Sequence, residues 1–151
     1  MGRSRAKIAL WNEGASIVTQ QNPTPEEVPY DIIGGEATVR ALVDRFYDLM
    51  DEDPDFYGIR KLHPESLSGS RQKLFMFLSG WLGGPQLYVN EFGHPRLRAR
   101  HLPFAIATPE RDQWLACMNR AMEDVGIELR LRQALARSFF GTADWMRNQE
   151  G

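Results

Sequence analysis

The sequence contains three histidines, His63, His94 and His101, and two of them could share a helix face. His94 and His101 are seven residues apart, which is two helical turns, so one straight helix would align both imidazoles as a pair of metal ligands. A structural zinc site needs about four ligands, however, and no cysteine cluster, His-Glu-x-x-His motif or aspartate-rich calcium loop accompanies this pair. We therefore disfavour zinc and interpret His94, which directly precedes Pro95, as a polar residue at the start of a helix.

Three arginines precede His101, and no acidic residue occurs between positions 92 and 109. A neutral imidazole can ligate iron through one ring nitrogen, and guanidinium groups nearby could neutralise an anionic ligand such as the propionates of a porphyrin. The same residues also fit a histidine stabilised by the dipole at a helix C-terminus, beside three solvated arginines, and helical spacing alone favours this interpretation. A phosphate-binding patch is a third interpretation. It is weaker because Arg96, Arg98 and Arg100 would spread around a helix.

Helical periodicity dominates the chain from residue 31 onward. Over residues 35–51, apolar side chains recur at spacings of three and four, which places them on one helix face with Tyr47 at its edge. A second helix is predicted over residues 67–82, and the sequence Gly83-Gly84-Pro85 ends it. The apolar positions of these two helices are Val39, Leu42, Val43, Phe46, Leu49 and Met50, and Leu67, Leu74, Phe77, Leu78, Trp81 and Leu82.

Three more helices are predicted after residue 93. Pro95 and Pro103 bracket a short helix that does not extend much beyond residues 95–101. Thr108 is a suitable N-cap for a helix with Pro109 at its first position, and its apolar face holds Trp114, Met118, Ala121, Met122 and Val125. A last helix follows Gly126 and carries Leu131, Leu135, Phe139 and either Trp145 or Met146. No segment alternates apolar and polar residues between turn signals, so the predicted fold class is all-α.

The composition fits one globular domain and excludes several classes of protein. The 151 residues include 18 Lys and Arg and 20 Asp and Glu, and this net charge of −2 argues against nucleic acid as a partner. The longest apolar run, residues 74–78, is far shorter than the ~20 residues of a membrane span, and the N-terminal apolar stretch is too short for a secretory signal. Cys117 is the only cysteine, which excludes an intrachain disulfide and favours a cytoplasmic location.

Residues 1–28 differ from the rest of the chain. They are polar, contain several glycines and prolines, and show no clear period. We predict a mobile N-terminal arm over residues 1–28 and one domain over residues 29–151.

Five segments of the chain together carry a family resemblance. They are Asp31-Ile-Ile-Gly-Gly-Glu36, Leu42-Val-Asp-Arg-Phe-Tyr-Asp48, Leu78-Ser-Gly-Trp-Leu-Gly-Gly-Pro85, Gly93-His-Pro-Arg-Leu-Arg-Ala-Arg-His-Leu-Pro-Phe104 and Glu110-Arg-Asp-Gln-Trp114. In this order, and with double glycines at helix ends, they resemble the group II truncated hemoglobins over residues 29–146. The resemblance implies the truncated globin fold, a two-over-two sandwich of α-helices around one heme b (iron protoporphyrin IX). It also favours the iron-ligand interpretation of His101.

The resemblance implies a role for each residue of the site. His101 matches the proximal iron ligand, while Tyr47, His63 and Trp114 match polar positions on the opposite, distal side, and Ser70 matches the gate to that side. Leu74 and Phe77 match residues that face the heme. Further pocket walls are matched by Phe46, Leu97, Phe104 and Ile106, and Lys73 and Arg100 match positions able to meet the heme propionates.

The chemistry of the distal residues supports this assignment. A dry pocket with aimed hydrogen-bond donors stabilises the negative charge that oxygen gains on ferrous iron, as an oxyanion hole does. An indole only donates, while a phenol and an imidazole can donate, so Trp114, Tyr47 and His63 could form a ring of donors. Taken singly, Trp114 would be an ordinary core residue beside Met118, and Tyr47 a boundary residue with its hydroxyl at the surface.

The predicted function is therefore that of a heme protein that binds oxygen and other diatomic ligands reversibly. We expect a five-coordinate iron, with Tyr47 or His63 as alternative sixth ligands, slow oxygen release, and carbon monoxide and nitric oxide as further ligands. The alternative is a nitric oxide dioxygenase or peroxidase-like enzyme that uses a separate reductase. A third class, an all-α interaction module without a cofactor, would need the arginine cluster as its working surface. Family members often pair, so a homodimer is also among the expected partners.

Overall fold

The computed structural model describes residues 28–150, so the predicted N-terminal arm lies outside the described residues except for Val28. Every regular element in this part of the chain is helical, which confirms the all-α class. The elements are α1 Pro29–Ile33, α2 Gly35–Glu52, the 3-10 helix η1 Pro54–Phe56, α3 Tyr57–Arg60, α4 Ser68–Trp81, α5 Leu87–Phe92, α6 Leu97–His101, α7 Thr108–Asp124 and α8 Leu129–Trp145. Across residues 28–150, no helix is long and apolar enough to cross a lipid bilayer.

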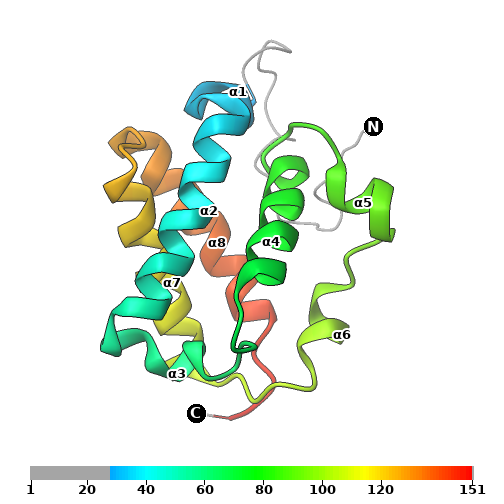
Figure 1. The fold of residues 1–151 in the computed structure, drawn as a ribbon, viewed down its shortest axis with the longest axis vertical. Helices are drawn as coiled ribbons and strands as arrows, with labels where there is room; N and C mark the ends of the chain where they lie inside the picture. The colour runs from blue at the N-terminus through cyan, green and yellow to red at the C-terminus, as the bar shows by residue number, and fades with distance from the viewer. Residues whose placement is uncertain (1–27, 151) are drawn as a thin grey trace.

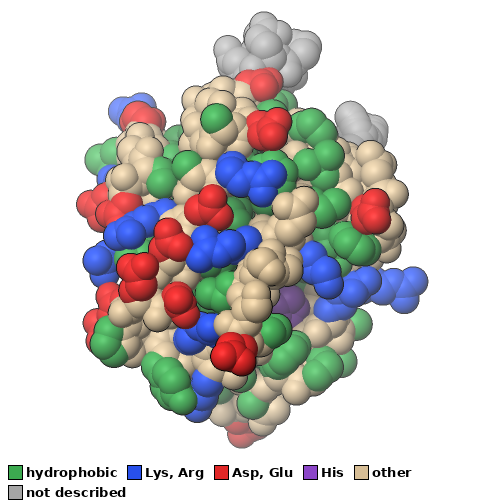
Figure 2. Space-filling model, viewed as in Figure 1, with side chains coloured by type: hydrophobic (Ala, Val, Ile, Leu, Met, Phe, Trp, Pro, Cys, Tyr) green, Lys and Arg blue, Asp and Glu red, His purple; other side chains and the backbone are tan. Residues whose placement is uncertain are grey.

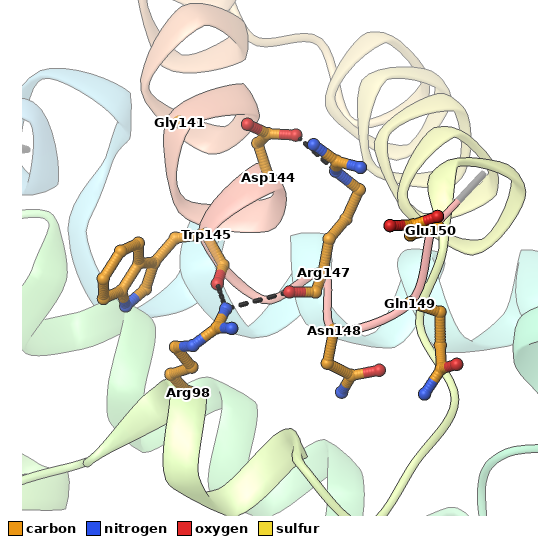
Figure 3. Close-up of a pocket in the computed structure, with 8 residues that line it drawn as sticks. All are labelled: Arg98, Gly141, Asp144, Trp145, Arg147, Asn148, Gln149 and Glu150. Carbon is orange, nitrogen blue, oxygen red and sulfur yellow. Dashed lines mark hydrogen bonds and ion pairs between the residues drawn. The ribbon is translucent and has the colours of Figure 1, made fainter.

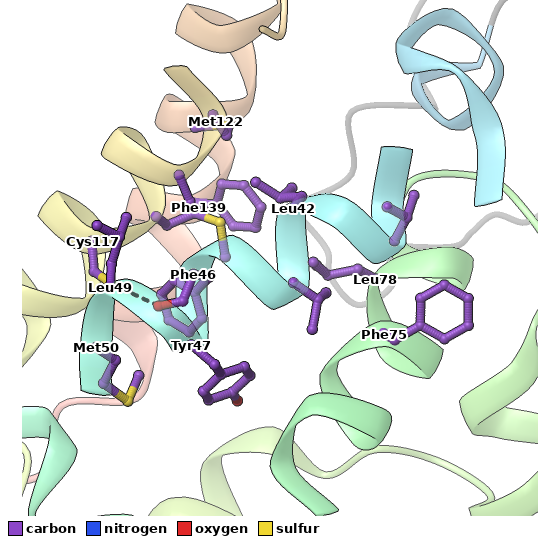
Figure 4. Packing of buried hydrophobic residues seen from close by; sticks show 14 of the residues in the cluster. Leu42, Phe46, Tyr47, Leu49, Met50, Phe75, Leu78, Cys117, Met122 and Phe139 are labelled. Atoms are coloured by element: carbon purple, nitrogen blue, oxygen red, sulfur yellow. Dashed lines mark hydrogen bonds between the residues drawn. The ribbon is translucent and has the colours of Figure 1, made fainter. Parts of the chain in front are cut away.

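The four long helices form two packed pairs. Helix α2 packs on α4, α7 packs on α8, and α2 crosses α7 between the pairs (Figure 1). This arrangement confirms the predicted two-over-two sandwich. The centre of the core lies where the helices meet (Figure 4), and its fully buried side chains include Val39, Leu42, Val43, Phe46, Leu78, Cys117, Met118, Met122 and Leu135. Burial of each large apolar side chain stabilises the fold by about 1.5–3 kcal/mol.

Helix α4 has two apolar faces rather than the single stripe predicted from the sequence. Phe75 and Leu78 are buried in the core, whereas Leu74 and Phe77 are only half-buried. The Phe77 ring lies edge-on to Tyr88 of α5, with 6.3 Å between the ring centroids. Leu74 and Phe77 therefore form an apolar face of α4 that the core does not fully cover.

The predicted cap of α7 is wrong. Thr108 is the first helical residue, and Ala107 precedes the helix. Because an alanine side chain cannot accept a hydrogen bond, the carboxylate of Glu110 reaches back and accepts one from the Ala107 backbone N–H at 2.8 Å. At the other end of the chain, Met146 is buried and Trp145 is exposed, which decides between the two predicted alternatives.

Helix α1 docks on the turn between α4 and α5 through a close backbone approach. The Tyr30 N–H donates to the Leu82 carbonyl at 2.9 Å, and the Tyr30 ring lies directly against Gly84. A Cβ atom at position 84 would lie 2.5 Å from ring atoms of Tyr30. The double glycine that ends the α4 segment is therefore required for packing as well as for helix termination.

We expect Gly84→Ala to destabilise the fold by about 1–3 kcal/mol, because the new methyl group must displace the Tyr30 ring. Gly141→Ala is the matched control. Gly141 lies within α8, and a Cβ there would meet no atom within 4 Å, so this substitution should stabilise the helix by up to about 1 kcal/mol. Urea unfolding followed by circular dichroism measures both changes. Equal unfolding midpoints for the two variants would contradict the close approach.

Candidate functional site

His101 is the last residue of α6, and a single hydrogen bond fixes its tautomer. Its Nδ1 atom lies 2.7 Å from the Leu97 carbonyl oxygen. Because a carbonyl can only accept, Nδ1 must carry the proton, and the lone pair of Nε2 is left free. No hydrogen bond to Nε2 occurs within residues 28–150. An imidazole held in this way is suited to bind a metal ion through Nε2.

His94 does not share a helix with His101. The backbone of Arg96 has a positive φ of 50° and interrupts the helix before α6, and its N–H donates to His94 Nδ1 at 3.0 Å. His94 is exposed and lies in a bend three residues before α6, so it is a polar residue that precedes the helix rather than its first residue. The predicted alignment of the two imidazoles does not occur.

His63 follows α3, and its tautomer is fixed in the same manner as that of His101. Its Nδ1 atom lies 2.8 Å from the Ile59 carbonyl, so Nε2 again keeps its lone pair. Burial lowers the pKa of His63, and the charges of Arg60 and His101 lower it further, against the opposing effect of the hydrogen bond to Ile59. A neutral His63 accepts a hydrogen bond through Nε2 rather than donating one. The predicted ring of three donors therefore becomes two donors and one acceptor.

Tyr47 is buried. Helical spacing alone would instead place it at the boundary of the core, with its hydroxyl at the surface. Only 5% of the residue is exposed, and its ring lies edge-on to Phe46 at 5.0 Å and to His63 at 5.8 Å between centroids. Figure 4 shows the hydroxyl pointing away from the packed core. Burial raises the pKa of the phenol well above its usual range. The hydroxyl has no hydrogen-bond partner among the described residues, so it is a protonated donor available to a ligand.

Trp114 lies on α7 and packs against other aromatic rings, one of which, Phe46, also contacts Tyr47. Its ring is tilted against Phe46, with 5.2 Å between centroids, and edge-on to Phe139 at 5.5 Å. It is half-buried, and its indole N–H has no hydrogen-bond partner within residues 28–150. Phe46 is fully buried behind both Tyr47 and Trp114. Phe46 thus supports the rings of two donors that have no hydrogen-bond partner within residues 28–150.

The remaining predicted residues differ in exposure. Ser70, Leu74 and Phe77 lie along α4 and are half-buried, as is Leu97 on α6. Ile106 is buried, whereas Phe104 is 41% exposed. Figure 2 shows histidine atoms recessed in a hollow between α4 and α6, with Lys and Arg side chains beside it.

Lys73 and Arg100 supply exposed positive charge on the two helices that flank this hollow. Lys73 lies on α4, with Nζ 5.7 Å from the centroid of the Phe92 ring. Arg100 lies on α6 and uses Nε to donate to the Pro95 carbonyl at 2.8 Å. One free imidazole nitrogen, partly covered apolar side chains, unpartnered donors and flanking cations together suit a flat, anionic iron macrocycle such as the predicted heme.

Gln113 and Arg71 position the site, and neither was identified from the sequence. The Gln113 side chain accepts a hydrogen bond from the Ile59 N–H at 3.1 Å, and the Ile59 carbonyl in turn bonds His63. Gly58 permits this approach, since a Cβ there would lie 2.6 Å from the Gln113 amide. Arg71 binds α4 to α2 by donating to Asp48 at 2.7 Å and to Asp44 at 3.2 Å, beside the Tyr47 ring. Helical periodicity carries no signal for either residue.

Known proteins resemble this chain over most of its length. Residues 29–148 match the family model described as bacterial-like globin. Group 2 truncated hemoglobin YjbI of Bacillus subtilis (strain 168) is 43% identical over 121 residues, which are 80% of this chain and 89% of that protein.

Solved structures show the same similarity. The cold-adapted truncated hemoglobin from the Antarctic marine bacterium Pseudoalteromonas haloplanktis TAC125 has a TM-score of 0.79 at 46% identity, covering 82% of this chain and 99% of that one. The truncated oxygen-avid haemoglobin from Bacillus subtilis has a TM-score of 0.75 at 42% identity, covering 81% of this chain and 100% of that one.

We expect Cys117 to resist thiol reagents in the folded protein. It is fully buried, its Sγ donates to the Phe46 carbonyl at 3.3 Å (Figure 4), and burial raises the pKa of the thiol from 9.0 to about 12. The reactive species is the thiolate, so labelling by Ellman's reagent at pH 8 should be slower by on the order of a thousandfold than in 8 M urea.

The same pKa shift predicts how the fold responds to alkaline pH. Because folding raises this pKa, the protonated thiol stabilises the fold up to pH about 9, and the contribution is lost as the pH rises toward about 12. Labelling of the native protein as fast as that of the urea-unfolded protein would contradict the buried placement.

Proposed function

The chain belongs to the bacterial-like globin family and is a group II truncated hemoglobin. We propose that it binds heme b through His101, that the iron is five-coordinate before a ligand arrives, and that Tyr47 and Trp114 stabilise the oxygen that then binds. A globin of this family is a heme protein for small diatomic ligands such as oxygen. The observation that carries the finer proposal is the free Nε2 atom of His101, which lies near enough to His63 to lower its pKa, while the ring of Tyr47 contacts that same His63. Tyr47, which is buried, and Trp114, which is half-buried, supply two donors without protein partners within residues 28–150.

A bound ferrous heme would supply reversible binding of a diatomic ligand, and His101 would hold its iron through Nε2. The Leu97 carbonyl accepts the Nδ1 proton of His101, which orients the ring and makes Nε2 a stronger electron donor. The half-buried face of Leu74 and Phe77 gives the porphyrin an apolar surface. Lys73 and Arg100 are the cations that would meet its propionates.

On the distal side, the two donors are not equivalent. The Tyr47 hydroxyl has one proton and makes no hydrogen bond within residues 28–150, but its ring lies edge-on to His63. A movement of either ring would let the Nε2 lone pair of neutral His63 compete with a bound ligand for that proton. The indole N–H of Trp114 has no competing acceptor among the described residues. We therefore assign the larger share of ligand stabilisation to Trp114, with Tyr47 donating in part and His63 tuning Tyr47.

Slow oxygen release is part of this proposal. It is supported by the two aimed donors and by the similarity to the haemoglobin from Bacillus subtilis that is described as oxygen-avid. Carbon monoxide and nitric oxide would enter the same space. A separate reductase, a homodimer and a cytoplasmic location stay predictions from the sequence.

We expect His101→Gly to lose tight heme binding, because the only proposed protein ligand to iron is removed. The Soret band of the purified variant should be weak or absent, and 10 mM imidazole should restore it by filling the cavity. His94→Ala is the matched control and should bind heme like the wild type, since His94 lies outside α6. A normal Soret band in His101→Gly without imidazole would exclude His101 as the ligand.

We expect Trp114→Phe to speed oxygen dissociation at least tenfold. Loss of a donor to a charged acceptor costs about 1.5–3 kcal/mol. Carbon monoxide gains little charge on iron, so its dissociation should change much less. Stopped-flow ligand replacement measures both rates, with Tyr57→Phe, at an exposed aromatic residue, as the control. Oxygen release within a factor of two of the wild type would refute the donor role.

A further inference from the structure

Helix α6 carries the proposed iron ligand, yet apolar packing contributes little to holding it. It has five residues and none of them is fully buried. It makes no extensive contact with another helix in the described part of the chain (Figure 1). The position of His101 must therefore be set by polar contacts.

Those contacts come from the segment that follows α8. The Asn148 side-chain amide donates to the His101 carbonyl at 3.2 Å and to the Phe104 carbonyl at 2.9 Å, and its oxygen accepts from the Ile106 N–H at 3.0 Å. The backbone N–H groups of Asn148 and Gln149 both donate to the Ile106 carbonyl, at 2.8 and 3.1 Å. The Asn148 side chain thus connects the C-terminal segment to the last residue of α6 and to Phe104 and Ile106, which follow this helix.

Arg98 makes the reciprocal connection from α6 to the same segment. Its Nη1 atom donates to the carbonyls of Trp145 and Arg147, at 2.6 and 2.8 Å (Figure 3), and its guanidinium lies 5.2 Å from the Trp145 ring. Carbonyls at a helix C-terminus lack partners within the helix, so Arg98 satisfies groups that α8 leaves open. Arg98 is one of the three arginines for which the sequence left a phosphate-binding patch open. The structure shows that its guanidinium binds backbone oxygens of the protein.

The segment is also fixed to α7. Asp144 accepts from Arg111 of α7 at 2.7 Å and from Arg147 at 2.8 Å. Arg111 is one helical turn before Trp114. The residues after α8 therefore join the helix of the proximal histidine to the helix of the distal tryptophan.

We propose that residues 145–149 form a C-terminal strap that positions His101 for the heme iron, with Asn148 and Arg98 as positioning residues. This inference rests on the proposed role of His101. The Leu97 carbonyl sets the tautomer of the ring, and the strap sets where the helix carrying the ring lies. Because coupling between two sites is reciprocal, heme binding in turn orders the strap.

The test compares Asn148→Asp with Gln149→Glu in the full-length, heme-loaded protein. Both replace an amide by a carboxylate, but only the first removes donors to the His101 and Phe104 carbonyls. We expect Asn148→Asp to raise the rate of hemin transfer to excess apomyoglobin at least fivefold and to shift the iron–histidine stretching band of the ferrous protein. Gln149→Glu should leave the rate within twofold and the band unchanged. Arg98→Leu, which removes the Nη1 donor to the Trp145 and Arg147 carbonyls, should change both readouts in the same direction as Asn148→Asp.

Hydrogen exchange of the wild type gives a second measurement that needs no variant. The amides of Ile106, Asn148 and Gln149 should exchange at least tenfold more slowly with heme than without it. Equal exchange in the two states, or an Asn148→Asp protein that matches Gln149→Glu in heme loss and in the stretching band, overturns the strap. Absence of the iron–histidine band in the wild type would overturn both the proposed function and the strap. A normal band in the wild type, with no change of heme loss or of the band in Asn148→Asp, would overturn the strap alone.

Discussion

The hydrogen bond from His101 Nδ1 to the Leu97 carbonyl is the interaction on which the site depends. The carbonyl four residues earlier decides which ring nitrogen keeps a lone pair, and only that nitrogen can bind iron. The same arrangement occurs at His63, whose Nδ1 donates to the carbonyl of Ile59, also four residues earlier. The two imidazoles therefore have the same tautomer, and each keeps a lone pair on Nε2. We assign them different roles in the proposed site, with His101 binding the iron and His63 accepting a hydrogen bond from a neighbouring donor.

The distal donors are placed at some cost in stability. A buried polar group without a partner destabilises a fold by about 1–3 kcal/mol, and the Tyr47 hydroxyl is such a group within residues 28–150. The surrounding core offsets this cost, because Phe46 packs fully buried against both Tyr47 and Trp114. The thiol of Cys117 fixes the same stretch of α2 through the Phe46 carbonyl. Dense packing on one side of each ring leaves its polar end free for a ligand.

The sequence predicts the long helices well because their periodicity and their ends are local signals. Helix α2 differs from its predicted range by one residue, and the double glycine ends the α4 segment as expected. Helical spacing alone predicts Tyr47 at the surface, which is wrong. Its burial depends on the packing of other helices against α2, and this packing leaves no signal in the local sequence. The contacts of Asn148 and Gln113 could not be predicted, because single polar side chains that bond distant backbone groups leave no periodic trace. His101 could be singled out only through the family resemblance, while its tautomer required the structure.

Helix α7 connects the two sides of the site. It carries Trp114, its Gln113 is connected to His63 through the Ile59 peptide, and its Arg111 binds Asp144 of α8, the residue before the C-terminal strap. Trp114 is thus fixed by a 17-residue helix of the core and Tyr47 by the 18-residue α2, whereas α6 is fixed by hydrogen bonds that water can replace. The two sides should differ in rigidity, so that conditions which weaken polar contacts loosen His101, the proposed iron ligand, before they disturb the proposed ligand pocket beside Tyr47 and Trp114. A globin built in this way would lose its heme from the proximal side while its core remains folded.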